Sequence, residues 1–149
     1  MTDSLTALST RRTIAVRNRI EELNTVYTLV EAVTQEAGLP ETLGRTLLLV
    51  SEELFCNIVR YGYPPETEDV IEFTLECGTD RIVLTFVDHA IAFDVSKDPS
   101  EPIDLPLEEM QPGGLGLFLV HHFAQSLRNW RDGDANITEV IVARQSGDA

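Results

Sequence analysis

The stretch "SEELFCNIVRYGYP", residues Ser51 to Pro64, determines how the middle of this chain folds. Leu54 and Ile58 continue a series of apolar residues at three- and four-residue steps, which is the spacing of one helix face. Glu53 and Asn57 stand beside that face. At about 100° per residue they lie only ~40° apart, so both border the apolar face, at the rim of a groove. A carboxylate there can act as a general base and an amide oxygen can hold a metal, but a solvated Glu and a boundary Asn give the same pattern.

Hydrophobic periodicity predicts the other elements, with alternation indicating strands and longer steps indicating helices. Pro40 separates two helices, and no repeat or linker divides the chain, so we expect a single domain over 1–149. The order is strand 13–18, helix 23–37, helix from about 40 to 61, strands 69–77 and 81–88, a loop over 94–113, a helical segment within 113–127, and strands 128–132 and 136–144. This order predicts an α+β fold, a two-layer sandwich with helices on one face of a mixed, mostly antiparallel sheet.

The composition is that of a globular domain, with 149 residues, 43% of them hydrophobic, and a net charge of −14. Such a charge repels a phosphate backbone, so no nucleic-acid partner is expected, and a nucleotide site must be built from local groups. No apolar run reaches the roughly 20 residues that span a bilayer, and the first residues lack a secretory signal. We therefore expect no membrane association and a cytoplasmic location. Cys56 and Cys77 are too few for a zinc site or a disulfide scaffold.

A glycine-rich segment, "PGGLGLFLV", follows the long loop. Gly113, Gly114 and Gly116 allow a close backbone approach to an anion, and the N-terminus of the helix behind them would direct N–H groups at it. Glycines also permit tight turns, and this alternative has comparable weight. The segment is neither a Walker A loop nor a dinucleotide fingerprint.

The third candidate is "VDHAIAFD", where Asp88 ends a predicted strand. A carboxylate at that position can accept a hydrogen bond from an exocyclic amine, although a turn-forming Asp is the simpler interpretation.

Taken together and in this order, the three stretches resemble the GHKL (Bergerat-fold) family of ATPases and kinases, and within it the anti-sigma factor serine kinases. "EELFCNIVRYGYP" is similar to the N box of that family, "DHAIAFD" to the first glycine box and "GGLGLFLV" to the second. The closing "DANITEVIV" resembles the terminal strand, where a Thr often helps to hold adenine. The likeness covers most of the chain beyond residue 40.

The resemblance implies ATP and Mg²⁺ as cofactors, with residues 94–113 as the lid over the nucleotide. It implies that Glu53 activates the attacking hydroxyl and that Asn57 is the Mg²⁺ ligand. The remaining nucleotide-binding positions that it implies are Asp88 for the adenine amino group, Ala90 and Phe93 from the first glycine box, Gly113, Gly114, Leu115, Gly116 and Leu117 around the phosphates, and Thr138 beside adenine.

The expected function is that of a serine/threonine kinase that phosphorylates a small STAS-like antagonist protein and, when free of it, holds a sigma factor inactive. A homodimer is expected on the resemblance alone. The alternative is a regulatory module of the same fold that binds nucleotide or partner with weak or no catalysis. Its support is Ala90, because the family usually has glycine there, and an added methyl group near adenine is tolerable only if Ala90 keeps a negative φ.

Overall fold

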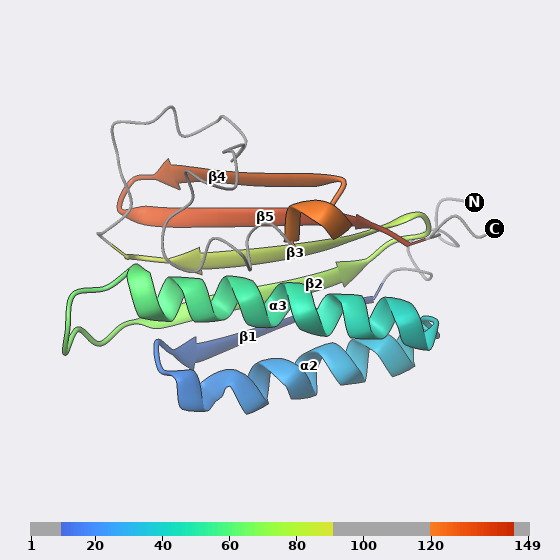
Figure 1. Cartoon of the computed structure of the whole chain (residues 1–149), viewed down its shortest axis with the longest axis horizontal. Helices are drawn as coiled ribbons and strands as arrows, with labels where there is room; N and C mark the ends of the chain where they lie inside the picture. The colour runs from blue at the N-terminus through green and yellow to red at the C-terminus, as the bar shows by residue number, and fades with distance from the viewer. Residues whose placement is uncertain (1–9, 91–119, 145–149) are drawn as a thin grey trace.

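The computed structural model describes residues 10–90 and 120–144, in which two long helices pack on a five-stranded sheet (Figure 1). The elements are β1 (Thr10–Arg17), the short 3₁₀ helix η1 (Ile20–Glu22), α2 (Leu23–Glu36), α3 (Glu41–Tyr61), β2 (Val70–Cys77), β3 (Arg81–Asp88), β4 (Ser126–Asp132) and β5 (Ala135–Ala143). Residues 120–123 are also helical. The loop over 94–113 lies outside the described residues.

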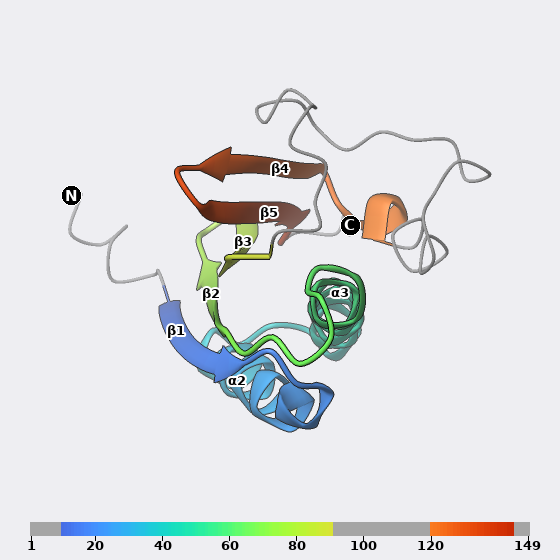
Figure 2. The ribbon, with the colours of Figure 1, turned by 90° about the vertical axis from the view of Figure 1, so that its left-hand side faces the viewer.

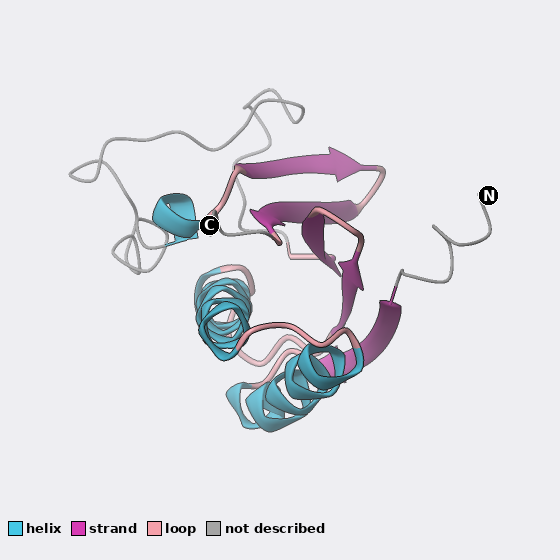
Figure 3. Ribbon diagram, turned by 90° about the vertical axis from the view of Figure 1, so that its right-hand side faces the viewer, coloured by secondary structure: helices cyan, strands magenta, loops and turns pink. Residues whose placement is uncertain are grey.

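The strands are arranged in the order β1-β2-β3-β5-β4. α2 packs against β1 and β2 and α3 against β3, so both helices lie on the same side of the sheet (Figures 2 and 3). The expected α+β class and the helix-covered face are confirmed. All four strand pairings are antiparallel, so in the part of the chain that the structure describes the sheet is uniform and not mixed.

The core lies between the sheet and the two helices. In β2 and β3 every second residue is buried, as the alternation predicts. Phe73 and Phe86 are paired across these strands and their rings stack with centroids 4.4 Å apart, at the centre of the buried face. α3 adds a continuous stripe that includes Leu47, Val50 and Leu54. Burial of this stripe fixes how α3 is rotated and therefore which of its side chains reach the rim.

Chain reversals fall where the sequence places them. α2 ends before Gly38, whose φ of +66° is the left-handed conformation that glycine adopts most readily after a helix. Pro40 then precedes α3, where its missing N–H leaves no unsatisfied donor. No helix in the described ranges is long and apolar enough to cross a membrane.

Two strand boundaries differ from the expectation. β1 begins at Thr10, three residues earlier than predicted. β4 begins at Ser126, inside the segment expected to be helical, so the helical prediction for the end of 113–127 is wrong. The physical reason is tertiary: Leu127 is 3% exposed and pairs with Val140, and the N–H of Gln125 donates to the carbonyl of Ile141 at 2.7 Å. These contacts with β5 outweigh the local helical spacing.

Candidate nucleotide-binding site

Glu53 and Asn57 lie on the rim of α3, as the spacing predicts. Both side chains are half-buried, whereas Leu54 and Ile58 beside them are almost fully buried. The Asn57 side-chain nitrogen donates to the main-chain carbonyl of Glu53 at 2.7 Å. The amide oxygen of Asn57 is therefore the atom left for a ligand, and oxygen is the donor that Mg²⁺ prefers.

The two adjacent glutamates of α3 have different environments. Glu52 accepts a hydrogen bond of 2.8 Å from the hydroxyl of Tyr27 in α2. Burial, together with this bond, raises the pKa of Tyr27 to about 12. Glu53 is rotated by about 100° from Glu52, and no hydrogen bond reaches its carboxylate from the described residues. Of the two, Glu53 is the one whose oxygens remain available to a substrate.

Asp88, the last residue of β3, is fully buried, and its two carboxylate oxygens are in different situations. Oδ1 accepts from the N–H of Ala90 at 2.8 Å and from the side-chain nitrogen of Asn136 at 3.2 Å. Oδ2 is buried and has no partner among the described residues. Burial raises the pKa of Asp88, and the donations from Ala90 and Asn136 oppose that shift. A buried acceptor without a donor is costly, so Oδ2 is suited to a ligand that brings one.

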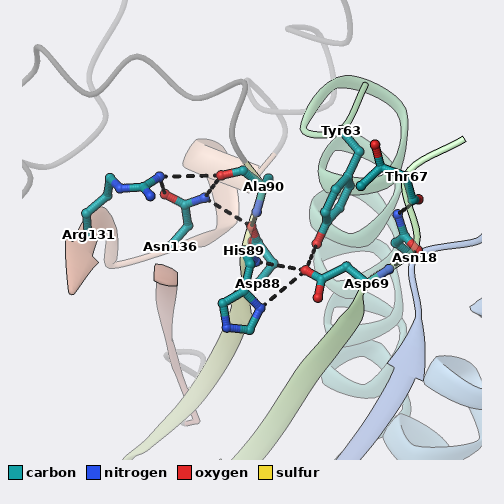
Figure 4. Close-up of polar contacts among 9 residues, drawn as sticks. All are labelled: Asn18, Tyr63, Thr67, Asp69, Asp88, His89, Ala90, Arg131 and Asn136. Carbon is teal, nitrogen blue, oxygen red and sulfur yellow. Dashed lines mark hydrogen bonds and ion pairs between the residues drawn. The ribbon is translucent and has the colours of Figure 1, made fainter. Parts of the chain in front are cut away.

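A polar cluster around Asp88 connects three segments of the sheet (Figure 4). Asn136 in β5 is fully buried, and its nitrogen donates to the carbonyl of Ala90 as well as to Asp88. Arg131 in β4 donates to the Asn136 oxygen at 2.9 Å and to the Ala90 carbonyl at 3.4 Å. The strand register explains the meeting, because Asn136 is paired with Asp88 on one side and with Arg131 on the other.

Thr138 lies on the same buried face of β5, two residues beyond Asn136. It is 4% exposed, and its hydroxyl oxygen accepts from the side-chain nitrogen of Asn129 at 2.9 Å. The accepting role leaves the hydroxyl proton of Thr138 free to donate elsewhere. The position fits a supporting role next to Asp88.

A second polar cluster holds the other side of the β3 terminus (Figure 4). Asp69 Oδ2 accepts from the Tyr63 hydroxyl at 2.6 Å and from the His89 N–H at 3.0 Å. Its own N–H donates to Asn18 at 2.9 Å. Burial acts to raise the pKa of Asp69, but the donors around it prevail and hold the pKa below its ordinary value. Tyr63, which follows α3, and His89, which follows β3, are thus both hydrogen-bonded to the same carboxylate oxygen of Asp69.

Ala90 and Gly62 bring the ends of β3 and α3 together. A methyl group built on Gly62 would lie 2.9 Å from the Ala90 Cβ and 2.6 Å from the Ile58 carbonyl oxygen. The methyl group of Ala90 is therefore directed at the space that Gly62 leaves open. Glu66 is the only described residue other than glycine with a positive φ, so Ala90 meets the condition that its backbone stay at negative φ.

The structure brings together some of the candidate residues from the sequence. Asn57 is five residues, about 7.5 Å along the helix axis, before Gly62, and Gly62 contacts Ala90. Asp88, Ala90 and Thr138 thus lie at neighbouring ends of β3 and β5, next to the last turn of α3, which begins near Asn57. Glu53 lies one helical turn earlier in α3. Phe93, Gly113, Gly114, Leu115, Gly116 and Leu117 lie outside the described residues.

Sequence reasoning missed Asn136, Arg131 and the cluster around Asp69. A signal was present for Asn136. The residues of β5 that face the helices are Asn136, Thr138, Val140 and Val142, and an Asn in the buried phase of a strand requires a partner. What the sequence did not give is the register that identifies Asp88 as that partner.

The chemistry of these groups fits the expected cofactors. The unpartnered Asp88 oxygen is an acceptor for an amino group, and the free Asn57 oxygen is a hard ligand. In the described ranges no cluster of three or more His, Cys, Asp or Glu side chains could hold a metal by itself. A single amide ligand is consistent with Mg²⁺, which keeps several waters and binds through substrate phosphates.

Comparison with known protein families assigns the chain to one of them. The histidine kinase-like ATPase domain matches residues 16–143, which is most of the chain. The chain therefore belongs to the histidine kinase-like ATPase family.

Individual relatives are also similar to it. The chain is 34% identical over 94 residues to the serine/threonine-protein kinase BtrW of Bordetella bronchiseptica, covering 62% of this chain and 66% of that protein. It is 33% identical over 86 residues to the serine-protein kinase RsbW of Bacillus cereus, covering 54% and 52% of the two chains. The match thus spans between about half and just under two thirds of these relatives.

A solved structure supports the same fold. The crystal structure of the RsbU and RsbW domains of a Mycobacterium tuberculosis protein superimposes with a TM-score of 0.60 and 14% identity, covering 91% of this chain and 33% of that one.

Proposed function

We propose that this protein is an ATP- and Mg²⁺-dependent serine/threonine kinase that phosphorylates a small antagonist protein. The observation that carries the proposal is that Asp88 is buried and one of its carboxylate oxygens has no partner among the described residues. Glu53 and Asn57 lie half-buried on α3 of the same histidine kinase-like ATPase domain. Relatives named as serine or serine/threonine kinases make protein phosphorylation the activity to test.

In this proposal, Asp88 Oδ2 accepts a hydrogen bond from the adenine amino group, and Thr138 supports the base. Asn57 would hold Mg²⁺ through its amide oxygen, and the ion would supply positive charge next to the phosphates. By resemblance to the family, backbone N–H groups around Gly114, Leu115 and Gly116 would bind phosphate oxygens, and residues 94–113 would correspond to the lid over the nucleotide.

Glu53 is proposed to act on the protein substrate and not on the nucleotide. Phosphoryl transfer requires an oriented hydroxyl and charge stabilisation more than covalent chemistry from the protein. The Glu53 carboxylate would orient the hydroxyl of the antagonist and take its proton as the hydroxyl oxygen bonds to the γ-phosphorus, while the bond from that phosphorus to the β–γ bridging oxygen breaks and ADP leaves. Half-burial gives this carboxylate access to a protein substrate that approaches from outside.

We further propose that the antagonist is a STAS-like domain, that the protein binds a sigma factor when free of it, and that it acts in the cytoplasm without binding nucleic acid. These assignments rest on the likeness to the RsbW-type kinases. The net charge of −14 supports a protein partner over nucleic acid.

A homodimer is the proposed assembly. No described helix covers the outer face of the sheet, and the apolar side chains of Trp130 and Ile137, paired between β4 and β5, are only half-buried there. Light scattering at micromolar concentration should return twice the mass of the 16.6 kDa chain. A monomer mass would contradict the dimer without affecting the kinase proposal.

The alternative of an inactive binding module is weakened by Ala90, because its methyl group faces Gly62 and its φ is negative. A mixing assay decides between the two functions. Purified protein, Mg-ATP and the antagonist encoded nearest to its gene are combined, and phosphoserine or phosphothreonine on the antagonist is measured by mass spectrometry. ATP binding without transfer would favour the binding module, and absence of ATP binding would contradict the site.

A further inference from the structure

Asn136 connects Asp88, Ala90 and Arg131 through its side-chain amide. Its nitrogen donates to Asp88 Oδ1 at 3.2 Å and also to the Ala90 carbonyl, and its oxygen accepts from Arg131 at 2.9 Å. The side chain is fully buried. Each of its polar atoms therefore has a partner, and two of the three partners belong to the segment that contains Asp88.

The donors and acceptors around Asn136 determine the orientation of its side-chain amide. Arg131 has only donors, so the atom that faces it must be the amide oxygen. The nitrogen then faces Asp88 and the Ala90 carbonyl, which can both accept. Arg131 also donates to the Ala90 carbonyl at 3.4 Å, so it holds both Asn136 and the chain that follows Asp88.

We propose that Asn136, oriented by Arg131, is a positioning residue that makes Asp88 an obligate hydrogen-bond acceptor and thereby selects adenine over guanine. The proposal rests on the proposed function, because it requires a nucleotide base at Asp88. In this proposal neither Asn136 nor Arg131 contacts the base. Both act on it through the Asp88 carboxylate.

The selectivity follows from the chemistry of the two purines. Adenine presents an amino group, a donor, at the position where guanine presents a carbonyl, an acceptor. An ionised carboxylate can only accept, so it pairs with the first and repels the second. A protonated carboxyl group can donate, and the discrimination would then be lost.

The buried environment of Asp88 works against its ionised form. Burial favours the protonated form of Asp88 and raises its pKa, and the nearby charge of Asp69 acts in the same direction. The donations from the Ala90 N–H and from Asn136 oppose both, and they occupy Oδ1, so Oδ2 is the oxygen left for the base. Asn136 is the only one of these two donors that a side-chain substitution can remove.

The test compares the affinities for ATP and GTP, both with Mg²⁺, by calorimetry. Asn136→Leu keeps the shape and removes the donor. We expect ATP affinity to fall about 10- to 100-fold, the value of a hydrogen bond to a charged group, while GTP affinity stays constant or rises. The ATP:GTP affinity ratio should therefore fall at least tenfold.

Arg131 provides a second variant nearer the surface. Arg131→Gln can present either end of its amide, so Asn136 is no longer fixed and the ratio should fall several-fold. Arg131→Lys still only donates and should keep a ratio near that of the parent. The matched control is Arg128→Gln on the same strand. Arg128 packs on Trp130, 5.0 Å from the ring centroid, on the opposite face of the sheet, and should leave the ratio unchanged.

The ratio separates positioning from a merely structural role, because general damage to the fold weakens both nucleotides together. A folded Asn136→Leu variant with the parental ratio would overturn the inference and leave the proposed function intact. If Asn136→Leu does not fold, the Arg131→Gln variant is decisive. A parental ATP:GTP affinity ratio in Arg131→Gln would also overturn the inference. A parent protein that binds neither nucleotide would overturn the proposed function and this inference with it.

Discussion

The two ends of the candidate site are built differently. At the sheet end, Asp88, Asn136 and Thr138 are at most 4% exposed and are joined to neighbours by hydrogen bonds. At the helix end, Glu53 and Asn57 are half-buried. Among the described residues, the one hydrogen bond made by either side chain is from the Asn57 nitrogen to the backbone carbonyl of Glu53. The sheet end is arranged before any ligand binds, whereas the helix end keeps its oxygens available.

The difference matches what each end is proposed to do. Choosing one base over another requires fixed donors and acceptors in a dry place, because water would pair with either base equally well. Positioning phosphates, a metal and an incoming hydroxyl requires groups that a partner protein can reach. Substitutions at the sheet end should therefore change the affinity and selectivity for the base, and those at the helix end should change phosphotransfer or the Mg²⁺-dependent part of nucleotide binding.

The largest expected effect is at the helix end. Glu53→Gln keeps the size of the side chain and removes the proton acceptor, so phosphotransfer to the antagonist should fall by roughly 10²–10⁴-fold. ATP affinity should change little. Rapid-quench transfer assays and calorimetry measure the two quantities. The control is Glu52→Gln. The carboxylate of Glu52 faces Tyr27, so this variant should transfer phosphate to the antagonist at nearly the parental rate. Equal rates for the parent and Glu53→Gln would remove Glu53 from the mechanism.

At the sheet end, Asp88→Asn should lower ATP affinity about 10- to 100-fold, because a charged acceptor is replaced by a neutral amide. Calorimetry measures this loss. An unchanged affinity would mean that the buried oxygen does not meet the base.

The same Asp88→Asn substitution should raise the free energy of unfolding by about 1 kcal/mol at pH 8, because it removes a buried charge. The sign of the pH dependence follows from the pKa. Since folding raises the pKa of Asp88, the parent gains stability as pH falls through the folded pKa towards the unfolded value near 3.8. The advantage of the variant should therefore shrink from pH 8 to pH 4. Urea denaturation at several pH values tests this, and an advantage that grows on acidification would contradict the direction of the shift.

Asn57→Ala should weaken nucleotide binding only when Mg²⁺ is present. We expect a loss of roughly tenfold or more in Mg-ATP affinity, the scale seen even for groups that only orient a metal ligand. In EDTA the variant and the parent should bind ATP equally. A loss of equal size under both conditions would show that Asn57 acts on the fold or on the nucleotide itself.

The smallest effect is expected at the junction of the two ends. Ala90→Gly removes a methyl group that faces Gly62, so ATP affinity should stay within about threefold of the parent. Calorimetry on the variant settles the point. A tenfold gain would place the methyl group in the path of the base and revive the inactive-module alternative.

Much of the fold could be read from the sequence. Apolar steps along α2 and α3 and alternation along β2 and β3 are local properties, and each element forms within a few residues of its predicted bounds. The exception is the start of β4. There the local helical spacing continues through Leu127, but pairing with β5 determines the structure.

The sequence by itself also determined the rim positions of Glu53 and Asn57, because helical geometry converts their spacing of four residues into proximity. It could not determine the partners of Asp88. Asn136 lies 48 residues away, and only the register of β3 on β5 brings the two side chains together. Gly62 and Ala90 meet for the same kind of reason, at the ends of two separate elements. Periodicity fixes which face a residue occupies, whereas contacts between distant segments depend on strand pairing and on how α3 packs over the sheet.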